Sequence, residues 1–465
     1  MRTLLRLAPA LVLLAPAAAQ APASPSDPAP APEDPVLARL LREALDRDPS
    51  LHKAAAQVRM DREKVPQAKA LPDPTLSLGM QNDGFNRIQV GRMETSFYSV
   101  AFTQPFPWPG KRGLRQDVAA LGVKVSETAE TRARLGLEAD VRRGYAELLL
   151  VRGQLALLKD QALFLDQAER LARTRYEVGQ GSQADLLRAQ LEKTRLEQAR
   201  FGLEADERSA LAALNRLRLH DPEDPIPTSI GLADLPEPAL LTPAQVEARS
   251  PEMAAARLGV EQTQRLVDLA RLDRRPDFAI TAGIMPRGSF DPMWQVGLSL
   301  SLPIYGRSKQ QRALAEHEHH LHAQDADVAA VRSLLRQRTE ERLAQIQSLE
   351  KSRSLYEQGL LVQSEASFRA TLAQYEAGRV GFLAALEALN GWVGDRGGYL
   401  QTLAQLQAQR IALREAGLAP TIPVSGGSMG AAAIAAGSSP SVRPSASAGG
   451  SAKAADAGPA PMSRM

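Results

Sequence analysis

Trp294-Gln295-Val296-Gly297-Leu298-Ser299-Leu300-Ser301 alternates large apolar residues with small or polar ones along its whole length. Successive side chains of a β-strand point to opposite faces, so this stretch predicts a strand with one apolar and one polar face. In a soluble protein the apolar face would cover a core. In a transmembrane barrel it would face lipid, with the polar face toward the lumen. The alternation alone does not decide between these two settings.

Three further segments show the same alternation and complete a set of four expected strands. They are Thr75-Leu76-Ser77-Leu78-Gly79-Met80-Gln81, Tyr98-Ser99-Val100-Ala101-Phe102-Thr103 and Phe278-Ala279-Ile280-Thr281-Ala282-Gly283-Ile284. Four strands cannot close a barrel alone, because the smallest outer-membrane barrels have about eight, so several chains would have to share one barrel. In that arrangement the lipid-facing residues would be Leu76, Leu78, Tyr98, Val100, Phe102, Phe278, Ile280, Trp294, Val296 and Leu298.

The segments between the strands are expected to be long helices. Ala, Leu, Gln, Glu and Arg dominate them, and an uninterrupted helical pattern runs from about Leu114 to Tyr176. Apolar residues recur every seven positions, which favours supercoiled packing against neighbouring helices. One such stripe is Val151, Leu158, Leu165 and Ala172, and another is Ala189, Leu196, Leu203, Ala210 and Leu217.

The chain contains an internal duplication with a period near 200 residues. Three pairs of segments carry it in the same order: Asp48-Pro49 and Ser250-Pro251, Leu71-Pro72-Asp73 and Arg275-Pro276-Asp277, and Arg175-Tyr176-Glu177-Val178-Gly179 and Gln374-Tyr375-Glu376-Ala377-Gly378. This period is too long for a solenoid repeat and indicates two homologous halves. Each half is expected to contain a helix, two strands, a long helix, a tight turn and a second long helix.

The two ends of the chain differ from its middle. Arg2 and Arg6, an apolar stretch and the small residues Ala17-Ala18-Ala19 predict a signal peptide at 1–19. The tail is rich in Ala, Gly, Ser and Pro and is expected to be disordered. The full expected organisation is a signal peptide at 1–19, a Pro/Ala-rich linker at 20–35, a first repeat at 36–220, a connector at 221–240, a second repeat at 241–417 and a tail at 418–465, with strands at about 75–82, 96–104, 277–285 and 293–302 and helical hairpins at about 110–218 and 307–416.

Composition excludes several classes of function. The formal net charge is only +3, with 56 basic against 53 acidic residues, so nucleic acid is not an expected partner. The absence of cysteine removes disulfides, thiolate metal sites and a lipid-anchor cysteine. No run reaches the roughly 18 consecutive apolar residues of a membrane-spanning helix, which excludes a helical inner-membrane transporter. No catalytic constellation or cofactor-binding motif is present, so we expect neither an enzyme nor a cofactor.

The order of these segments and the sequences at their junctions resemble the TolC-like outer-membrane efflux proteins. The matching junctions are Ala70-Leu71-Pro72-Asp73-Pro74, Gln104-Pro105-Phe106-Pro107-Trp108-Pro109-Gly110-Lys111-Arg112, Arg274-Arg275-Pro276-Asp277 and Leu302-Pro303-Ile304-Tyr305-Gly306. The resemblance covers roughly residues 34–417, and the Pro-Trp-Pro-Gly-Lys-Arg segment is similar to the heavy-metal efflux branch. One departure is the cluster Gly391, Gly394, Gly397 and Gly398, which we expect to kink the last helix, to make it locally thin or to let it pack very closely on a neighbour.

The resemblance implies a mainly α-helical fold with a small β portion, assembled as a homotrimer. Three chains would form a 12-stranded β-barrel in the outer membrane of a Gram-negative bacterium, in contact with its lipid, and a hollow α-helical barrel in the periplasm. The chain would then be a passive channel, working with a periplasmic adaptor (membrane fusion) protein and an inner-membrane pump of the resistance-nodulation-division type. Heavy-metal cations are the expected cargo, with drugs or a secreted protein as the alternatives.

The two helix-turn-helix tips are the main candidate sites. Glycines supply the backbone freedom that a tight reversal needs, and Ser182 can cap the returning helix with Asp185 in its first turn. The resemblance implies that these tips close the periplasmic mouth and contact the adaptor, although the same residues would also serve a turn alone. The tip residues are Gly179, Gly181, Ser182, Asp185, Leu186, Gly378, Arg379, Gly381, Phe382 and Leu383.

A histidine cluster is the second candidate site. Glu316-His317-Glu318-His319-His320-Leu321-His322 holds four of the six histidines of the chain. On a helix, His317 and His320 share one face, as do His319 and His322, and such pairs can bind zinc, copper, cobalt or nickel ions. The alternative interpretation is a solvated polar face.

Two other functions are compatible with parts of the sequence. A soluble periplasmic coiled-coil adaptor or scaffold would explain the signal peptide and the helices, but would need a soluble core beneath the four strands. A metal-binding periplasmic chaperone would rest on the histidine cluster alone.

Overall fold

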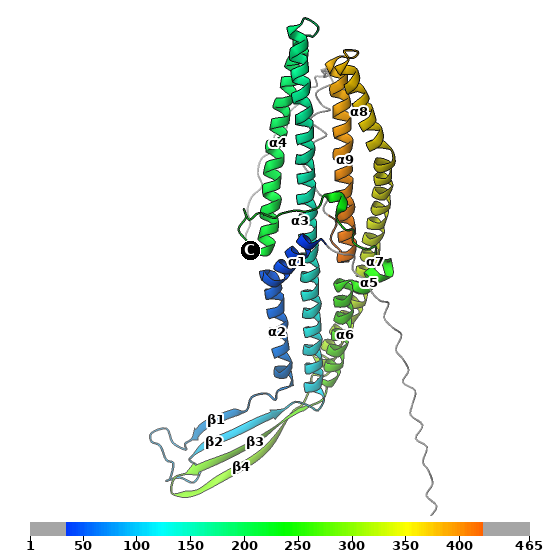
Figure 1. Cartoon of the computed structure of the whole chain (residues 1–465). Coiled ribbons are helices and arrows are strands. Elements are labelled where there is room, and N and C mark those ends of the chain that lie inside the picture. Colours follow the sequence, from blue (N-terminus) through cyan, green and yellow to red (C-terminus); the bar gives the residue numbers. More distant parts are fainter. Residues whose placement is uncertain (1–33, 422–465) are drawn as a thin grey trace, which may run out of the picture. The chain divides into compact units, whose positions relative to one another are not determined.

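The computed structural model describes residues 34–421 (Figure 1). The expected signal peptide, the linker as far as residue 33 and the tail from residue 422 lie outside the described residues. Within them, the predicted fold class is confirmed: the chain is mainly helical, with four antiparallel strands in a duplicated order.

The two halves of the described chain contain corresponding elements. The first half consists of α1 (Pro35–Arg47), α2 (Pro49–Lys69), β1 (Thr75–Gln81), β2 (Phe97–Phe106), α3 (Lys111–Glu177) and α4 (Gln183–Arg218). A connector with the short 3-10 turn η1 (Leu232–Asp234) follows. The second half consists of α5 (Pro243–Arg249), α6 (Pro251–Leu272), β3 (Asp277–Arg287), β4 (Phe290–Ser301), α7 (Gln310–Leu355), a π-helical turn η2 (Tyr356–Leu360), α8 (Leu361–Glu376) and α9 (Phe382–Glu415).

The corresponding helices α2 and α6 begin in the same way. Asp48 caps α2 by accepting a hydrogen bond from the Ser50 amide at 2.7 Å, and Ser250 caps α6 by accepting from the Met253 amide at 3.5 Å. A proline follows each cap at the first helical position, where its missing N–H costs nothing. The repeated cap-Pro pair of the sequence is therefore a repeated helix start.

The long helix α3 connects the sheet to the first tip (Figure 1). It runs for 67 residues without a proline, which corresponds to roughly 100 Å at 1.5 Å per residue. The seven-residue stripe that ends at Ala172 is buried along its whole length. The helix α4 packs antiparallel to α3, and the second stripe, on α4, is buried except for Leu196, which is half-buried. The predicted seven-residue packing is present in this hairpin.

The largest core lies where α1, α3, α4, the connector and α9 meet. Its fully buried side chains include Leu40, Tyr145, Leu148, Leu214 and Ile226. A second core joins α5, α7 and α9. Because α9 contributes to both cores, it links the first half of the chain to the second.

The four strands form one antiparallel sheet in the order β1-β2-β3-β4. The two hairpins join through β2 and β3, with Val100 opposite Ile284 and Thr103 opposite Thr281. β1 and β4 are therefore the two edges of the sheet. None of the helices within residues 34–421 is both long enough and apolar enough to cross a membrane.

The glycine-rich part of α9 has no break, and at one glycine it packs closely on a neighbour. The helix is continuous, and an added Cβ would meet nothing within 4 Å at Gly391, Gly394 and Gly397. Only Gly398 has a close neighbour, because a Cβ there would lie 2.5 Å from the Tyr356 hydroxyl. The irregularity lies instead in the facing helix, where the π-helical turn beginning at Tyr356 separates α7 from α8. Of the four glycines, Gly398 is the one whose missing side chain leaves space for the Tyr356 side chain at the start of this turn.

Candidate functional site

The sheet places all ten of the predicted lipid-facing residues on one face. The strand register sets Leu78 opposite Val100, and Val100 opposite Ile284 in the second hairpin. Ile280 lies opposite Leu298 on the last strand. Because directly opposed residues of an antiparallel pair share a face, one apolar face extends across all four strands.

This apolar face is exposed to an unusual degree. Leu78 is 74% exposed, Leu298 66% and Trp294 77%. The opposite face carries small and polar residues such as Ser77, Thr103, Thr281 and Ser299. In the described part of the chain nothing covers the apolar face, so it has the exposure expected of a surface that another phase or another chain must cover.

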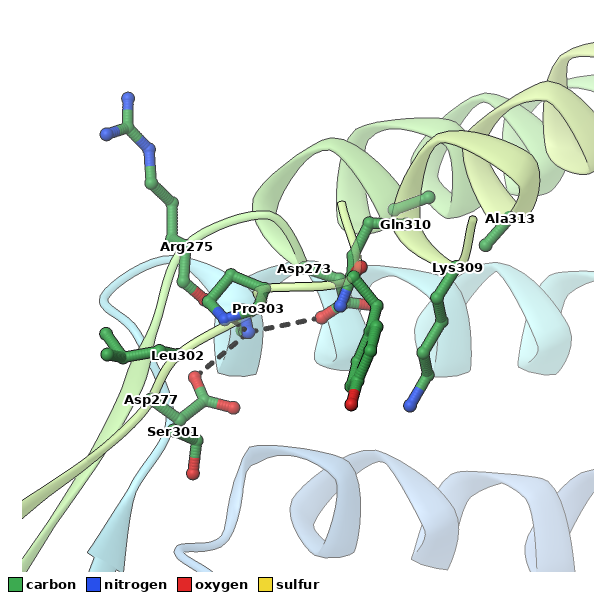
Figure 2. A pocket seen from close by; sticks show the side chains of 12 residues that line it. Asp273, Arg275, Asp277, Ser301, Leu302, Pro303, Lys309, Gln310 and Ala313 are labelled. Atoms are coloured by element: carbon green, nitrogen blue, oxygen red, sulfur yellow. Dashed lines mark hydrogen bonds and ion pairs between the residues drawn. The ribbon is translucent and has the colours of Figure 1, made fainter. Parts of the chain in front are cut away.

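The buried Lys111 joins the two halves of the chain where the sheet meets the helices. Figure 2 labels its two acidic partners, Asp273 and Asp277, which lie close to each other in the second half. The Nζ atom of Lys111 lies 2.9 Å from a carboxylate oxygen of Asp277 and 3.2 Å from one of Asp273. The Trp108 amide donates to the same carboxylate of Asp277 at 2.7 Å. The lysine at the start of α3 thus binds the residue after α6 and the first residue of β3, beside a cavity of about 450 Å³ that Lys309 also lines.

The ion pairs of Lys111 were not predicted from the sequence, where this residue appears only in a junction that resembles the TolC-like family. A usable signal was present. A lysine in the first turn of a helix is unfavourably placed against the helix dipole, so its presence there points to a carboxylate supplied by another element. The sequence does not reveal that this carboxylate belongs to the other half of the chain.

Both tips end their first helix with the same backbone motif. The amide of Gly179 donates to the carbonyl of Tyr176 and that of Gln180 to the carbonyl of Arg175, and the second tip repeats the pair at Gly378 and Arg379. Gly179 and Gly378 both have φ of +74°, the left-handed conformation that favours glycine. The predicted turn chemistry is present, including a Ser182 side chain that accepts from the Asp185 amide at 3.2 Å.

One side chain joins the two tips. The Arg175 guanidinium donates to the carbonyl oxygens of Tyr375 at 2.6 Å and Glu376 at 3.1 Å, and lies 4.9 Å from the centre of the Tyr375 ring. These carbonyls are at the C-terminal end of α8, where a cation is favoured by the helix dipole. Arg175 therefore fastens the end of α3 to the end of α8.

The predicted tip residues do not all reach the surface. Phe382 is only 1% exposed and its ring packs at 6.0 Å from that of Tyr375, whose burial raises its hydroxyl pKa. Gly181 lies against Arg175 and is half-buried, as are Asp185 and Leu186. The exposed tip residues are Gly179, Ser182, Gly378, Arg379, Gly381 and Leu383.

The histidine cluster lies near the start of α7. His319, His320 and His322 are exposed and His317 is half-buried. Within residues 34–421 no three or more His, Cys, Asp or Glu side chains are arranged to hold a metal ion together. One chain therefore offers at most two-ligand pairs at this place.

Comparison with protein families gives one match over most of the chain. The family described as "Outer membrane efflux protein" matches residues 40–220 and 242–417. These two segments correspond to the two halves seen in the structure.

Two curated relatives are metal-resistance proteins. The nickel-cobalt-cadmium resistance protein NccC of Alcaligenes xylosoxydans xylosoxydans is 26% identical over 279 residues, which span 60% of this chain and 63% of NccC. The cobalt-zinc-cadmium resistance protein CzcC of Cupriavidus metallidurans is 24% identical over 363 residues, which span 77% of this chain and 83% of CzcC.

A solved structure shares the fold. The MtrE outer membrane channel of Neisseria gonorrhoeae, in its open state, superimposes with a TM-score of 0.71 at 18% identity. The superposition covers 83% of this chain and 89% of that one.

Proposed function

Because the chain belongs to the outer membrane efflux protein family, we propose that three copies form a passive efflux channel in the outer membrane. The four strands of each copy would complete a 12-stranded barrel, and the helical hairpins would extend into the periplasm as a hollow helical barrel. Family membership also confirms the expectation that the chain is an efflux protein and not an enzyme.

The two-sided sheet is the observation that carries this proposal. Its apolar residues are exposed together on one face, and its small and polar residues lie on the other. Each of the two edge strands, β1 and β4, has one side without a neighbouring strand in the described chain. A soluble protein would leave this apolar face in water, at roughly 25 cal/mol for each Å². In a closed barrel the same face meets lipid, the polar face lines the lumen and no edge remains.

The two tips are the proposed site of closure and of adaptor contact. Arg175 would hold the two tips together in a closed mouth, because it bridges helices from both hairpins. The exposed residues, among them Ser182, Arg379 and Leu383, would be available to a periplasmic adaptor. The chain has no evident energy source of its own, so an inner-membrane pump of the resistance-nodulation-division type would drive transport.

Divalent heavy-metal cations are the proposed cargo. The support is the similarity to two relatives whose names state resistance to nickel, cobalt, zinc or cadmium. The histidine pairs of α7, three of whose four side chains are exposed, could bind such ions weakly and release them, which suits a conduit better than a storage site. Drugs or a secreted protein are the alternative cargoes.

The mature chain, purified from membranes in detergent, tests the channel proposal. We expect an SDS-resistant trimer that produces discrete conductance steps in a planar lipid bilayer. Release of a monomer by osmotic shock would contradict the channel and would favour the soluble periplasmic scaffold.

Metal resistance of cells that lack the gene tests the cargo. The wild-type gene should restore growth on cobalt, zinc or nickel, and the quadruple substitution of His317, His319, His320 and His322 by alanine tests the cluster. Reduced resistance with an unchanged trimer would assign the histidines a role in metal transfer. Unchanged resistance would leave them as a solvated surface and would remove the basis for a metal-binding chaperone.

A further inference from the structure

The duplication of the sequence extends to the strand registers. Pro72-Asp73 before β1 corresponds to Pro276-Asp277 before β3, so residue numbers in β3 exceed those in β1 by 204. After β2 and β4, Pro107, Gly110 and Lys111 correspond to Pro303, Gly306 and Arg307, with a difference of 196. The two differences are unequal because the loop between β1 and β2 is longer than the turn between β3 and β4.

The structure verifies both correspondences independently. In the first hairpin Thr75 lies opposite Thr103. Applying the two differences predicts that residue 279 lies opposite residue 299, and the second hairpin does pair Ala279 with Ser299. The two hairpins are therefore equivalent in register as well as in order.

The pairing of β2 with β3 joins the two hairpins, and the equivalent pairing of β4 with β1 is not made within the described chain. Within residues 34–421 no strand pairs with the outer edge of β4, and none pairs with the outer edge of β1. If the two halves are equivalent, β4 must pair with the β1 of another copy as β2 pairs with β3. The alternating directions of the four strands make this contact antiparallel too.

We propose that β4 pairs with β1 of a second copy in the register that places Ser299 opposite Ser77, fastened by an ion pair between Arg307 and the other copy's Asp73. This inference rests on the proposed trimeric channel and specifies its subunit contact. The register follows from the observed pair of Thr103 in β2 and Thr281 in β3, whose hydroxyl oxygens lie 2.9 Å apart. The counterpart of Thr103 in β4 is Ser299, and the counterpart of Thr281 in β1 is Ser77.

The residue types at the proposed contact support this register. Each apolar residue faces an apolar one and each polar residue a polar one, although the register was transferred without reference to the side chains. The pairs are Leu76 with Leu300, Ser77 with Ser299, Leu78 with Leu298, Gly79 with Gly297, Met80 with Val296 and Gln81 with Gln295. A slip of one residue would set serines against leucines and exchange the two faces of the strand.

The ion pair follows from the same transfer. Within the chain, Lys111 binds Asp277 at 2.9 Å. The counterpart of Lys111 is Arg307, and that of Asp277 is Asp73. Both counterparts are exposed, and within residues 34–421 neither makes an ion pair or a side-chain hydrogen bond. A cation and a carboxylate that lack partners in one chain would meet between two chains.

The contact between copies would differ from its internal counterpart in one respect. Asp273, the second carboxylate on Lys111, corresponds to Lys69. Arg307 would therefore meet one carboxylate and a nearby like charge. The ion pair between copies should therefore be weaker than the one that Lys111 makes within the chain. The backbone hydrogen bonds between β4 and β1 would then contribute most of the stability of the contact.

Disulfide cross-linking tests the register, since the chain has no native cysteine. Two double variants probe adjacent pairs: Ser77→Cys with Ser299→Cys, and Leu78→Cys with Leu298→Cys. One of two adjacent pairs is of the closer, non-hydrogen-bonded type. The matched control, Ser77→Cys with Ser301→Cys, uses the same face two residues away. We expect covalent trimers from at least one register pair, with a yield at least about fivefold above the control, because a disulfide needs its Cβ atoms within about 4.5 Å.

Charge reversal tests the ion pair separately. Asp73→Arg and Arg307→Asp should each lower the temperature at which the SDS-resistant trimer dissociates, and the double reversal should restore it. Lys309→Asp, which makes the same reversal of charge two residues away, is the control and should have a smaller effect. If the double reversal is no better than the worse single variant, the ion pair is wrong.

The outcomes separate this inference from the channel proposal. A wild-type chain that forms no oligomer refutes the channel, and the contact with it. If the wild-type chain is a trimer but the cysteine variants cross-link preferentially at positions 77 and 301, or do not cross-link at the two register pairs, the register is refuted and the channel proposal stands. Cross-linking at the register pairs with no effect of charge reversal supports the strand contact and refutes its fastening.

Discussion

At the scale of single residues, Arg175 has the most specific role in the tips. It donates to two carbonyl oxygens at the end of α8 and stacks on Tyr375. Arg175→Ala removes these contacts, at a cost of about 2 kcal/mol for charged hydrogen bonds. We expect the tips to separate more easily, which would raise the conductance or open probability in planar bilayers.

The matched control for this variant is Arg173→Ala. Arg173 lies two residues away in the same helix, and among the described residues its only ion pair is with Glu169 of that helix, at 3.6 Å. Its replacement should leave the conductance unchanged. Equal conductance of Arg175→Ala and wild type would show that the bridge between the tips does not hold the mouth closed.

Glu147 is expected to make stability depend on pH. Burial, with a smaller contribution from repulsion by Asp206, raises its pKa above the ordinary value of 4.5. A raised carboxyl pKa means that the folded state disfavours the charged form, so stability is greatest below the ordinary pKa and falls as pH rises through the folded pKa. Glu147→Gln should therefore raise the melting temperature near pH 8, and this gain should vanish near pH 4.

Glu207 provides the contrasting control for the pH experiment. Its carboxylate lies 2.7 Å from Arg152. Glu207→Gln should lower the melting temperature near pH 8, because it removes a charge that has a partner. A gain of similar size from both substitutions would contradict the burial argument for Glu147.

At the scale of elements, the π-helical turn and α9 fit each other at one glycine. An added Cβ at Gly398 would lie 2.5 Å from the Tyr356 hydroxyl, whereas at Gly394 it would meet nothing. Alanine is favoured over glycine inside a helix by about 0.5–1 kcal/mol, so Gly394→Ala should raise the melting temperature. Gly398→Ala should lower it, since crowding of a packed contact costs about 1–3 kcal/mol.

A double variant identifies the cause of the Gly398 effect. Tyr356→Phe removes the crowding oxygen, so Gly398→Ala should be better tolerated when Tyr356→Phe is also present. Circular dichroism in detergent gives the melting temperatures of the wild type, the three single variants and the double variant. If Gly394→Ala and Gly398→Ala behave alike, the close approach to Tyr356 does not constrain the helix.

Local sequence signals predicted the elements well, and contacts between distant elements poorly. The alternation in β4 and the seven-residue stripe ending at Ala172 each depend on neighbouring residues, and both features are present. The glycine cluster predicted a kink, a locally thin helix or very close packing on a neighbour; Gly398 does pack closely on Tyr356, and the irregular turn lies in the facing helix. That outcome depends on which helices pack together, which local periodicity does not encode.

The candidate sites show the same limit. The turn chemistry of the tips follows from glycine and serine at fixed spacing, and it was predictable. The bridges made by Lys111 and Arg175 join residues 166 and 200 positions apart, and no local pattern indicates their partners. Phe382 was expected among the contact residues of the tip, but the structure buries it beneath Tyr375.

At the scale of the whole molecule, the two faces of the sheet should respond differently to the same substitution. Leu298 lies on the apolar face and its neighbour Ser299 on the opposite one. Lysine on a lipid-facing strand costs about 2–4 kcal/mol near the bilayer midplane. Leu298→Lys should therefore reduce the amount of trimer recovered from membranes.

Ser299→Lys is the matched substitution on the other face. It should allow assembly, because a lumen-facing lysine stays in water, and it should reduce conductance to cations by placing positive charges in the lumen. Conductance in planar bilayers and the trimer yield measure the two effects. Equal loss of trimer from both variants would contradict the assignment of lipid and lumen faces.

The seven-residue spacing in the α3 and α4 hairpin also limits how such a molecule can change its reach during evolution. An insertion in α3 whose length is not a multiple of seven residues would rotate the apolar stripe beyond it away from α4. An insertion in α3 alone would leave the returning helix α4 too short. Paired insertions of seven residues, one in each helix, preserve the seam and extend the hairpin by about 10 Å. The distance that relatives of this chain can span should therefore vary in discrete increments, with few intermediate lengths.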